Sequence, residues 1–326
     1  MSNTIPYVIV GGGPVGLIAA KLLQLHQKAF VGLEKTDRLG GKLSTLPSRL
    51  FSDESVVFFR SFLPTVEWNL INSTTLERVK GEWKAPEPAT LTLIEKPFLQ
   101  NRYYSPDKSW VVDLAQEIVA NFQLRSEVSE VIEGEKKIVY SDGKEVFYEK
   151  LLWCADLSKL RKAWKGNTTS FLKVLKGIPE PVGVFDLELE LATPLRDEVG
   201  SILFPFRYKE KKLRAIGVRE LSKMHWLVPL EAEIAEDREE VAKCVRTLKR
   251  ELGKEFSDLK EKTQAERIVF YPDLSPSEPK EVKSLTALPD VLYLGSQLRR
   301  EECDKRLFHL DVAVDNCRHF EQTLRG

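Results

Sequence analysis

Glycines near the amino terminus are spaced as in loops that bind the pyrophosphate of a dinucleotide. Gly11, Gly13 and Gly16 follow the apolar run 7–10, and an apolar helix pattern continues from there to about His26. Gly11 would permit the tight turn out of a strand, Gly13 would leave room for a phosphate, and Gly16 would let the helix pack closely. The helix N-terminus would face the phosphates, because its free N–H groups favour negative charge. The pattern predicts a dinucleotide site.

A carboxylate stands where the ribose of such a nucleotide would lie. Glu34 ends a second apolar run, 29–33, that completes a β-α-β pattern with the first strand and the helix. A carboxylate at this place can accept hydrogen bonds from the ribose hydroxyls and would repel a 2′-phosphate. The alternative is a glycine-rich turn without a ligand, which leaves the strand, the helix and the acid unexplained together.

The residues after this strand favour FAD over NAD through a resemblance. The run Glu34-Lys35-Thr36-Asp37-Arg38-Leu39-Gly40-Gly41-Lys42 resembles the Glu-x-x-x-Arg-x-Gly-Gly-Arg of flavoproteins that include amine oxidases, protoporphyrinogen oxidase and phytoene desaturases. The resemblance implies that Gly40 and Gly41 pass close to the FAD pyrophosphate and ribityl chain. Lys42 replaces the last arginine, which keeps the charge but loses the bidentate guanidinium. Without this run, NAD would be an equal alternative.

Two segments in the middle of the chain extend the resemblance. It implies that a strand at Val128 offers backbone groups to the adenine, and that the chain returns to the sheet near the cofactor around Cys154. A covalent flavin link through Cys154 is one hypothesis. We prefer a small buried side chain, the more common role of a cysteine without a partner.

The carboxyl-terminal segment matches the third motif of these flavoproteins only in part. In that family an apolar strand is followed by Gly-Asp, a loop, and a helix that reads Gly-Ala near its start. Gly295 matches, Ser296 replaces the acid, and Val312 after Asp311 stands where glycine is usual. The adenine end is therefore expected to hold the cofactor better than the flavin end. The complete set of residues predicted to contact FAD is Gly11, Gly13, Pro14, Val15, Gly16, Glu34, Lys35, Arg38, Gly40, Gly41, Lys42, Val128, Cys154, Gly295, Ser296, Asp311 and Val312.

The composition disfavours several other classes of protein. The 326 residues include 49 Lys and Arg and 49 Asp and Glu, whereas a nucleic-acid binder is more often strongly basic. No apolar run approaches the ~20 residues that span a bilayer. The early fingerprint leaves no room for a signal peptide, so a cytoplasmic protein is expected. The four cysteines and four histidines show no spacing typical of a redox or metal site. The oligomeric state stays open.

The elements that must position these residues indicate an α/β protein with two domains. Asp142-Gly143 between two alternating runs predicts a hairpin, alternation from Val184 to Leu191 begins a set of antiparallel strands, and 233–256 is predicted as one amphipathic helix. We expect a discontinuous Rossmann-like FAD-binding domain with an inserted mixed-sheet α+β substrate domain. The expected FAD-binding segments are 1–45, 107–165 and 286–326, and the expected substrate-domain segments are 46–106 and 166–285.

The leading functional hypothesis is an FAD-dependent oxidoreductase of the amine oxidase-like type. A small or flat apolar substrate would transfer a hydride to the flavin, and no catalytic side chain can be named. A redox-neutral flavoenzyme or a non-catalytic FAD-binding protein is the alternative. Five aromatic side chains could line a pocket for a flat substrate, but ordinary core packing is preferred: Phe58, Phe59, Trp68, Tyr103 and Tyr104.

Overall fold

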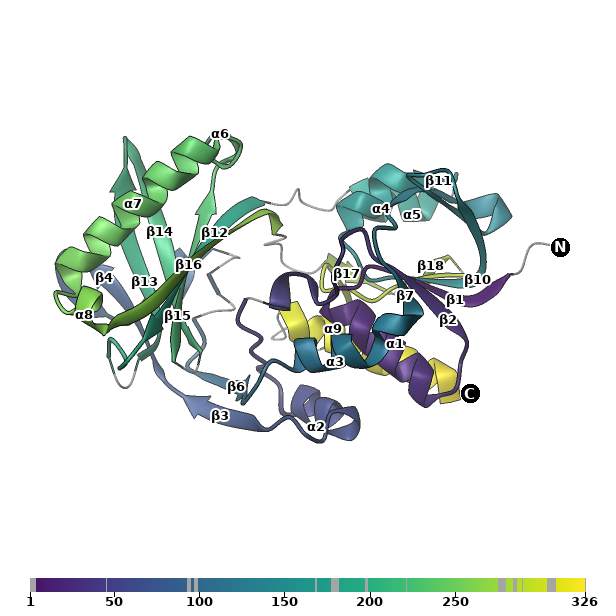
Figure 1. The fold of residues 1–326 in the computed structure, drawn as a ribbon, viewed down its shortest axis with the longest axis horizontal. Coiled ribbons are helices and arrows are strands. Elements are labelled where there is room, and N and C mark those ends of the chain that lie inside the picture. The colour runs from purple at the N-terminus through teal and green to yellow at the C-terminus, as the bar shows by residue number, and fades with distance from the viewer. Residues whose placement is uncertain are drawn as a thin grey trace. The chain divides into compact units, whose positions relative to one another are not determined.

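The chain folds into two units, each with its own sheet. The first unit comprises Met1–Trp68, Pro106–Pro179 and Glu278–Gly326, and the second comprises Asn69–Ser105 and Glu180–Ser277 (Figure 1). The computed structural model describes residues 4–44, 46–92, 95–96, 99–167, 169–176, 182–196, 199–220, 222–274, 280–283, 286–288, 290–303 and 309–325.

A parallel β-α-β arrangement lies at the centre of the first unit. Strand β1 (Ile5–Val10), helix α1 (Pro14–Leu25) and strand β2 (Phe30–Leu33) follow one another. β1 pairs in parallel with β2 on one side and with β10 (Glu145–Trp153) on the other. The carboxyl ends of these three strands therefore meet at one edge of the sheet, where ligands of open α/β sheets bind.

The sheet of the first unit has the strand order β11-β8-β9-β10-β1-β2-β7, with β19 pairing with β10 and β18 with β19. The further strands are β7 (Phe122–Gln123), β8 (Val128–Ile132), β9 (Lys137–Tyr140), β11 (Trp164–Lys165), β17 (Lys280–Val282), β18 (Thr286–Leu288), β19 (Val291–Tyr293) and β20 (Leu298–Arg300). β17 and β20 form a separate parallel pair.

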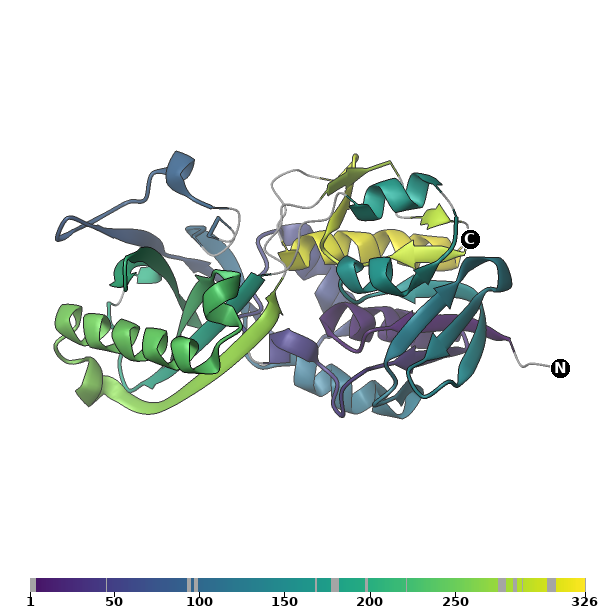
Figure 2. The ribbon, with the colours of Figure 1, turned by 90° about the horizontal axis from the view of Figure 1, so that it is seen from above.

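Helices cover this sheet through apolar faces. The further helices of the first unit are α2 (Asp53–Phe62), α3 (Trp110–Ile118), α4 (Leu157–Ala163), α5 (Thr169–Lys176) and α9 (His309–Arg325), with 3-10 helices η1 (Gly41–Ser44), η3 (Val119–Asn121) and η4 (Glu133–Glu135). α1 packs beside α3 and α9, as both ribbon views show (Figures 1 and 2). Of the aromatics proposed for a substrate pocket, Phe59 is fully buried and its ring lies 4.8 Å from that of Trp110. This agrees with core packing.

The second unit is a mixed sheet with one face against a long helix. The strand order is β16-β12-β15-β14-β13-β4-β5, all pairs being antiparallel except β13 with β4. The strands of this sheet are β4 (Thr74–Val79), β5 (Glu82–Lys84), β12 (Val182–Leu191), β13 (Val199–Tyr208), β14 (Lys211–Glu220), β15 (Lys223–Leu230) and β16 (Thr263–Leu274). β3 (Trp68–Asn72) and β6 (Arg102–Pro106) form a separate two-stranded sheet. The helices are η2 (Pro88–Thr90), α6 (Ala232–Ala235), α7 (Arg238–Glu255) and α8 (Leu259–Lys262).

Alternation along β12 decides which face of this sheet meets α7. Phe185, Leu187 and Leu189 pack in one core cluster with Leu248 and Leu252 of α7. The residues between them in the strand point to the opposite face, since side chains alternate along a strand.

The predicted α/β class, the hairpin and the antiparallel strands are confirmed, and several details differ. The helix expected over 233–256 is broken, because Asp237 caps α7 by accepting hydrogen bonds from the N–H groups of Glu239 and Glu240.

The boundary between the units also differs from the expected one. Residues 46–68, 166–179 and 278–285, expected in the second domain, belong to the first unit. The reason for 46–68 is that the chain entering α2 bonds to α9: the N–H groups of Phe51 and Ser52 donate to the carboxylate of Asp311.

Candidate dinucleotide site

The turn after β1 depends on the absence of side chains at Gly11 and Gly16. Gly11 has a φ of +104°, and a Cβ there would lie 3.0 Å from the backbone nitrogen of Ala155. A Cβ on Gly16 would lie 1.8 Å from the carbonyl oxygen of Gly11. The Gly11 N–H donates to Leu33 O at 2.8 Å, which fastens the turn to the end of β2. The first helical turn is therefore held tightly against the strand, as the glycine spacing predicted.

The N-terminus of α1 is open at Gly13. This residue is the N-cap, has extended backbone angles and provides no side-chain cap; Pro14 and Val15 begin the helix. Apart from Gly13 itself and its two neighbours in the chain, no described residue has an atom within 4 Å of the position that a Gly13 Cβ would take. Pro14 has no N–H, whereas the N–H groups that follow lack intrahelical partners. This end of α1 can accept an anion.

Glu34 lies directly beside this loop, half-buried at the end of β2. Its Oε2 accepts the Gly12 N–H at 2.7 Å, and its Oε1 accepts the Thr36 N–H at 2.9 Å. The Thr36 hydroxyl donates to the same Oε1 at 2.8 Å. These three donors fix the carboxylate, and its remaining lone pairs can accept hydrogen bonds from ribose hydroxyls.

The second glycine pair packs on the first loop. The Gly40 N–H donates to Gly12 O at 2.8 Å. A Cβ on Gly41 would approach the Cα of Gly13 to 3.1 Å. Both residues have positive φ, +103° and +54°, a conformation that favours glycine. The structure thus brings together two glycine motifs that the sequence separates. Of the basic residues predicted nearby, Lys35 and Arg38 are exposed and Lys42 is half-buried.

The segments of Val128 and Cys154 also reach this edge of the sheet. Val128 begins β8, and just before it the Ser126 N–H donates to Glu34 O at 2.8 Å. Cys154 follows β10, and its N–H donates to Val10 O at 2.9 Å. Burial raises the pKa of the Cys154 thiol well above its ordinary value, so this thiol is a poor nucleophile.

The third predicted segment is arranged differently from the expectation. Asp311 was expected to face the cofactor, but it is fully buried and its two carboxylate oxygens accept the Phe51 and Ser52 N–H groups, each at 3.0 Å. Burial raises its pKa to about 6, although these donors favour the ionised form. Val312 is likewise fully buried within α9. Gly295 is buried and Ser296 half-buried after β19.

Comparison with known proteins shows which fold carries this site. A profile for an NAD(P)-binding Rossmann-like domain matches residues 9–58, which include both glycine motifs. Cyclohexylamine oxidase from Brevibacterium oxydans superimposes with a TM-score of 0.63 at 9% identity, over 99% of this chain and 100% of that one. An oxidoreductase from Methanosarcina mazei superimposes with a TM-score of 0.61 at 14% identity, over 98% of this chain and 100% of that one. PqsL from Pseudomonas aeruginosa, a probable FAD-dependent monooxygenase, superimposes with a TM-score of 0.57 at 12% identity, over 99% of this chain and 86% of that one.

This chain has the fold of FAD-dependent oxidoreductases. No curated protein sequence matches it, so outside residues 9–58, which the family profile matches, the similarity is one of structure. At these identities the fold alone is shared. No helix in the described part of the chain is long and apolar enough to cross a membrane.

Two buried amides, which the sequence analysis did not identify, position the third segment of this fold. The Asn316 side chain donates to Gly295 O at 2.8 Å and to Leu298 O at 3.0 Å. The Gln297 side chain accepts the Leu157 N–H at 2.7 Å. The turn after Gly295 is therefore held from α9 and tied to α4. Neither residue belongs to a recognisable motif, because an amide that bonds to backbone groups needs no fixed spacing.

Proposed function

We propose that this chain is an FAD-dependent oxidoreductase that acts on a small-molecule substrate. The observation that carries the proposal is the packing of Gly40 and Gly41 on the glycine loop at Gly12 and Gly13. In the flavoproteins that the sequence resembles, this second pair passes beside the pyrophosphate and ribityl chain of FAD. The glycine loop by itself would serve NAD equally well.

The residues at this edge of the sheet suit a dinucleotide. The open N-terminus of α1 at Gly13 would bind the pyrophosphate, and the fixed carboxylate of Glu34 would accept from the ribose hydroxyls. When bound, FAD would supply a flavin ring that takes up a hydride from the substrate. The chain itself would bind the adenine half and orient the ring.

We further propose that the protein acts in the cytoplasm. Cys154, Cys244 and Cys317 form no disulfide among the described residues, as is usual in a reducing compartment.

A redox-neutral or non-catalytic FAD-binding protein is the second candidate. The observation that favours it is the state of Asp311, whose carboxylate is engaged by the backbone of Phe51 and Ser52. Ser296 offers only a short hydroxyl where relatives place an acid. The flavin end of the site would then hold the ring more loosely than the adenine end.

The test begins with the absorbance spectrum of the freshly purified protein and mass spectrometry of any cofactor that denaturation releases. FAD supports the proposal, and release of NADP without flavin would overturn it. Anaerobic mixing with a panel of small amines and planar aromatic compounds then separates the two candidates. Bleaching of the flavin that air reverses indicates an oxidase. Substrate-dependent turnover only after chemical reduction of the flavin indicates a redox-neutral enzyme.

A pair of glycine variants locates the phosphate. Gly13→Asp places a negative charge where the pyrophosphate would lie, and we expect loss of FAD with the fold retained by circular dichroism. Gly134→Asp is the matched control, because Gly134 also has open space around it but lies in η4, away from the loop. Wild-type FAD affinity in Gly13→Asp would place the phosphate elsewhere.

A further inference from the structure

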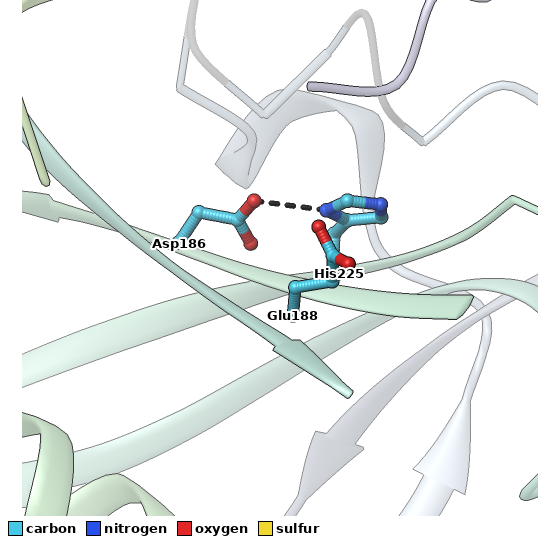
Figure 3. Close-up of side chains that lie close together, drawn as sticks. All are labelled: Asp186, Glu188 and His225. Atoms are coloured by element: carbon cyan, nitrogen blue, oxygen red, sulfur yellow. Dashed lines mark hydrogen bonds and ion pairs between the residues drawn. The ribbon is translucent and has the colours of Figure 1, made fainter. Parts of the chain in front are cut away.

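A buried group of ionisable side chains lies on the second unit's sheet, on the face opposite α7. Asp186 and Glu188 are alternate residues of β12, so both point to the same face. His225 of β15 is the direct partner of Glu188 in the antiparallel register, which places its side chain on that face too. Figure 3 shows the two carboxylates and the imidazole close together.

The three side chains converge closely enough to share one small ion. One ligand atom of each residue lies within 4.8 Å of the others. His225 Nδ1 lies 2.8 Å from Asp186 Oδ2. All three residues are buried: Asp186 is 0%, His225 1% and Glu188 7% exposed. Water therefore contributes little to the solvation of these charges.

One carboxylate oxygen of this group has no hydrogen-bond partner among the described residues. Lys223 forms an ion pair with Glu188, its Nζ lying 2.5 Å from Oε1. Asp186 is paired with His225, and its other oxygen, Oδ1, is buried without a hydrogen-bond partner among the described residues. A buried carboxylate oxygen without a partner is costly. A cation bound beside Asp186 Oδ1 would supply the partner that this oxygen lacks.

We propose that Asp186, Glu188 and His225 form a binding site for a divalent transition-metal ion, with Zn²⁺ or Mn²⁺ as the suited class. An imidazole nitrogen beside carboxylate oxygens favours transition metals over Mg²⁺ and Ca²⁺, which prefer all-oxygen sites. Metal–ligand bonds of about 2.0–2.2 Å set the ligand atoms roughly 3–4 Å apart, so small side-chain rotations suffice. The Nδ1 of His225, Oδ1 of Asp186 and the second oxygen of Glu188 supply the three ligands.

Three protein ligands leave a coordination position open. In zinc sites, a three-ligand set with a free position is typical of catalytic rather than structural metal, because a water or substrate atom completes the shell. The metal would bind the Nδ1 of His225, and the single proton of the neutral ring would then lie on Nε2, the tautomer that leaves Nδ1 free to coordinate. This site does not depend on the proposed flavin chemistry.

The test is a metal titration of the full-length protein after treatment with a chelator. Calorimetry with Zn²⁺ and with Mn²⁺ should show one equivalent bound per chain by wild type. Asp186→Asn and His225→Gln should each weaken binding by more than about ten-fold, because even the loss of a group that only orients a ligand typically costs about 10–100-fold. Glu190→Gln is the matched control, because it removes a carboxylate from the next same-face position of β12 and should leave binding unchanged.

Lys223 provides a variant with an opposite expected sign. Lys223→Met removes the cation that competes for Glu188, so metal affinity should rise, whereas a purely structural ion pair would only lose stability. If a ligand variant fails to fold, X-ray absorption of Zn²⁺-loaded wild type decides. A shell of nitrogen and oxygen supports the site, and a sulfur shell at about 2.3 Å would mean binding to cysteine. No uptake, or uptake equal in wild type and both ligand variants, would overturn the proposal.

Discussion

The carboxylate of Glu34 accepts hydrogen bonds from the protein and is also predicted to accept them from the ribose. Two backbone N–H groups and one hydroxyl hold it, at distances between 2.7 and 2.9 Å. The Gly12 N–H is one of these donors, so the residue that reads the ribose also supports the loop that binds the phosphates. A substitution that tests ribose binding should therefore keep an oxygen that can accept the Gly12 N–H.

Glu34→Gln should weaken FAD binding while keeping an acceptor for the Gly12 N–H. The lost charge-assisted hydrogen bond to ribose is worth about 1.5–3 kcal/mol, so the dissociation constant should rise about ten- to a hundred-fold. Fluorescence titration of apoprotein with FAD measures it. Glu127→Gln, a change of an exposed acid before β8, is the control, and equal affinities in the two variants would contradict the assignment of the ribose.

Asp311 is a residue whose ionisation opposes folding. Its pKa is raised from 3.8 to about 6 by burial, so the folded protein binds more protons than the unfolded chain between these values. Stability should fall as pH rises from about 4 to 6 and change no further above that. The two-unit shift corresponds to about 3 kcal/mol at 1.36 kcal/mol per unit.

Asp311→Asn should abolish this contribution. Its stability relative to wild type should improve as pH rises from 4 to 7, although the amide can accept from only one of the Phe51 and Ser52 N–H groups. Urea denaturation across this range is the measurement. Asp142→Asn is a control for which the pH dependence should have the opposite sign. Lys144 lowers the pKa of Asp142, so the stability of this variant relative to wild type should fall as pH rises. A pH-independent difference between Asp311→Asn and wild type would show that Asp311 is not titrating there.

At the scale of elements, α7 is the helix that gives the second unit its core. Its charged face is exposed, and its apolar stripe packs on the sheet at Leu248 and Leu252. The break before it follows from Asp237, whose side chain satisfies two N–H groups that a continuous helix would have bonded internally. Capping thus decides where this helix begins.

Removal of that cap should destabilise the unit by a modest amount. Asp237→Ala leaves the Glu239 and Glu240 N–H groups without their acceptor, at a cost of about 0.5–2 kcal/mol. Asp237→Ser keeps a capping oxygen and should retain most of the stability. Chemical denaturation measures the free energy of unfolding of wild type and the two variants. An equal loss of stability in Asp237→Ser and Asp237→Ala would show that the loss does not come from the capping hydrogen bonds.

At the scale of the whole molecule, the residues predicted to bind the adenine end of FAD are arranged as expected, whereas those predicted to bind the flavin end are not. The glycine loop, Glu34 and the segment before Val128 meet through backbone hydrogen bonds. At the other end, Asp311 and Val312 are buried in contacts of the protein with itself. The adenine half should therefore supply most of the affinity.

Competition among three ligands of the full-length protein tests this asymmetry. ADP-ribose should displace FAD effectively, and FMN should bind negligibly, because FMN lacks the adenine half. Calorimetric displacement titration is the measurement. FMN binding as tight as FAD would mean that Ser296 and its neighbours form a competent flavin site of a different design.

Sequence alone determined the β-α-β unit and the position of its glycines, because those contacts are local. The turn at Gly11, the open cap at Gly13 and the carboxylate of Glu34 lie within one continuous segment, and each needs a particular residue type. The hairpin around Gly143, with its φ of +82°, is predictable for the same reason. The cap at Asp237 was missed, because the helix was expected to run unbroken over 233–256, although Asp237 followed three residues later by Glu240 is a spacing typical of a helix start.

Only the tertiary structure decided which distant residues meet. Asp311 and Phe51 are 260 positions apart, and nothing in their spacing predicts that a carboxylate expected at the flavin would instead hold the entry to α2. Asp186 and His225, 39 positions apart, come together through the register of β12 and β15. The absence of a metal motif in the sequence therefore said little about this site, because strand pairing is set by the packing of the whole sheet and not by the spacing of its polar residues.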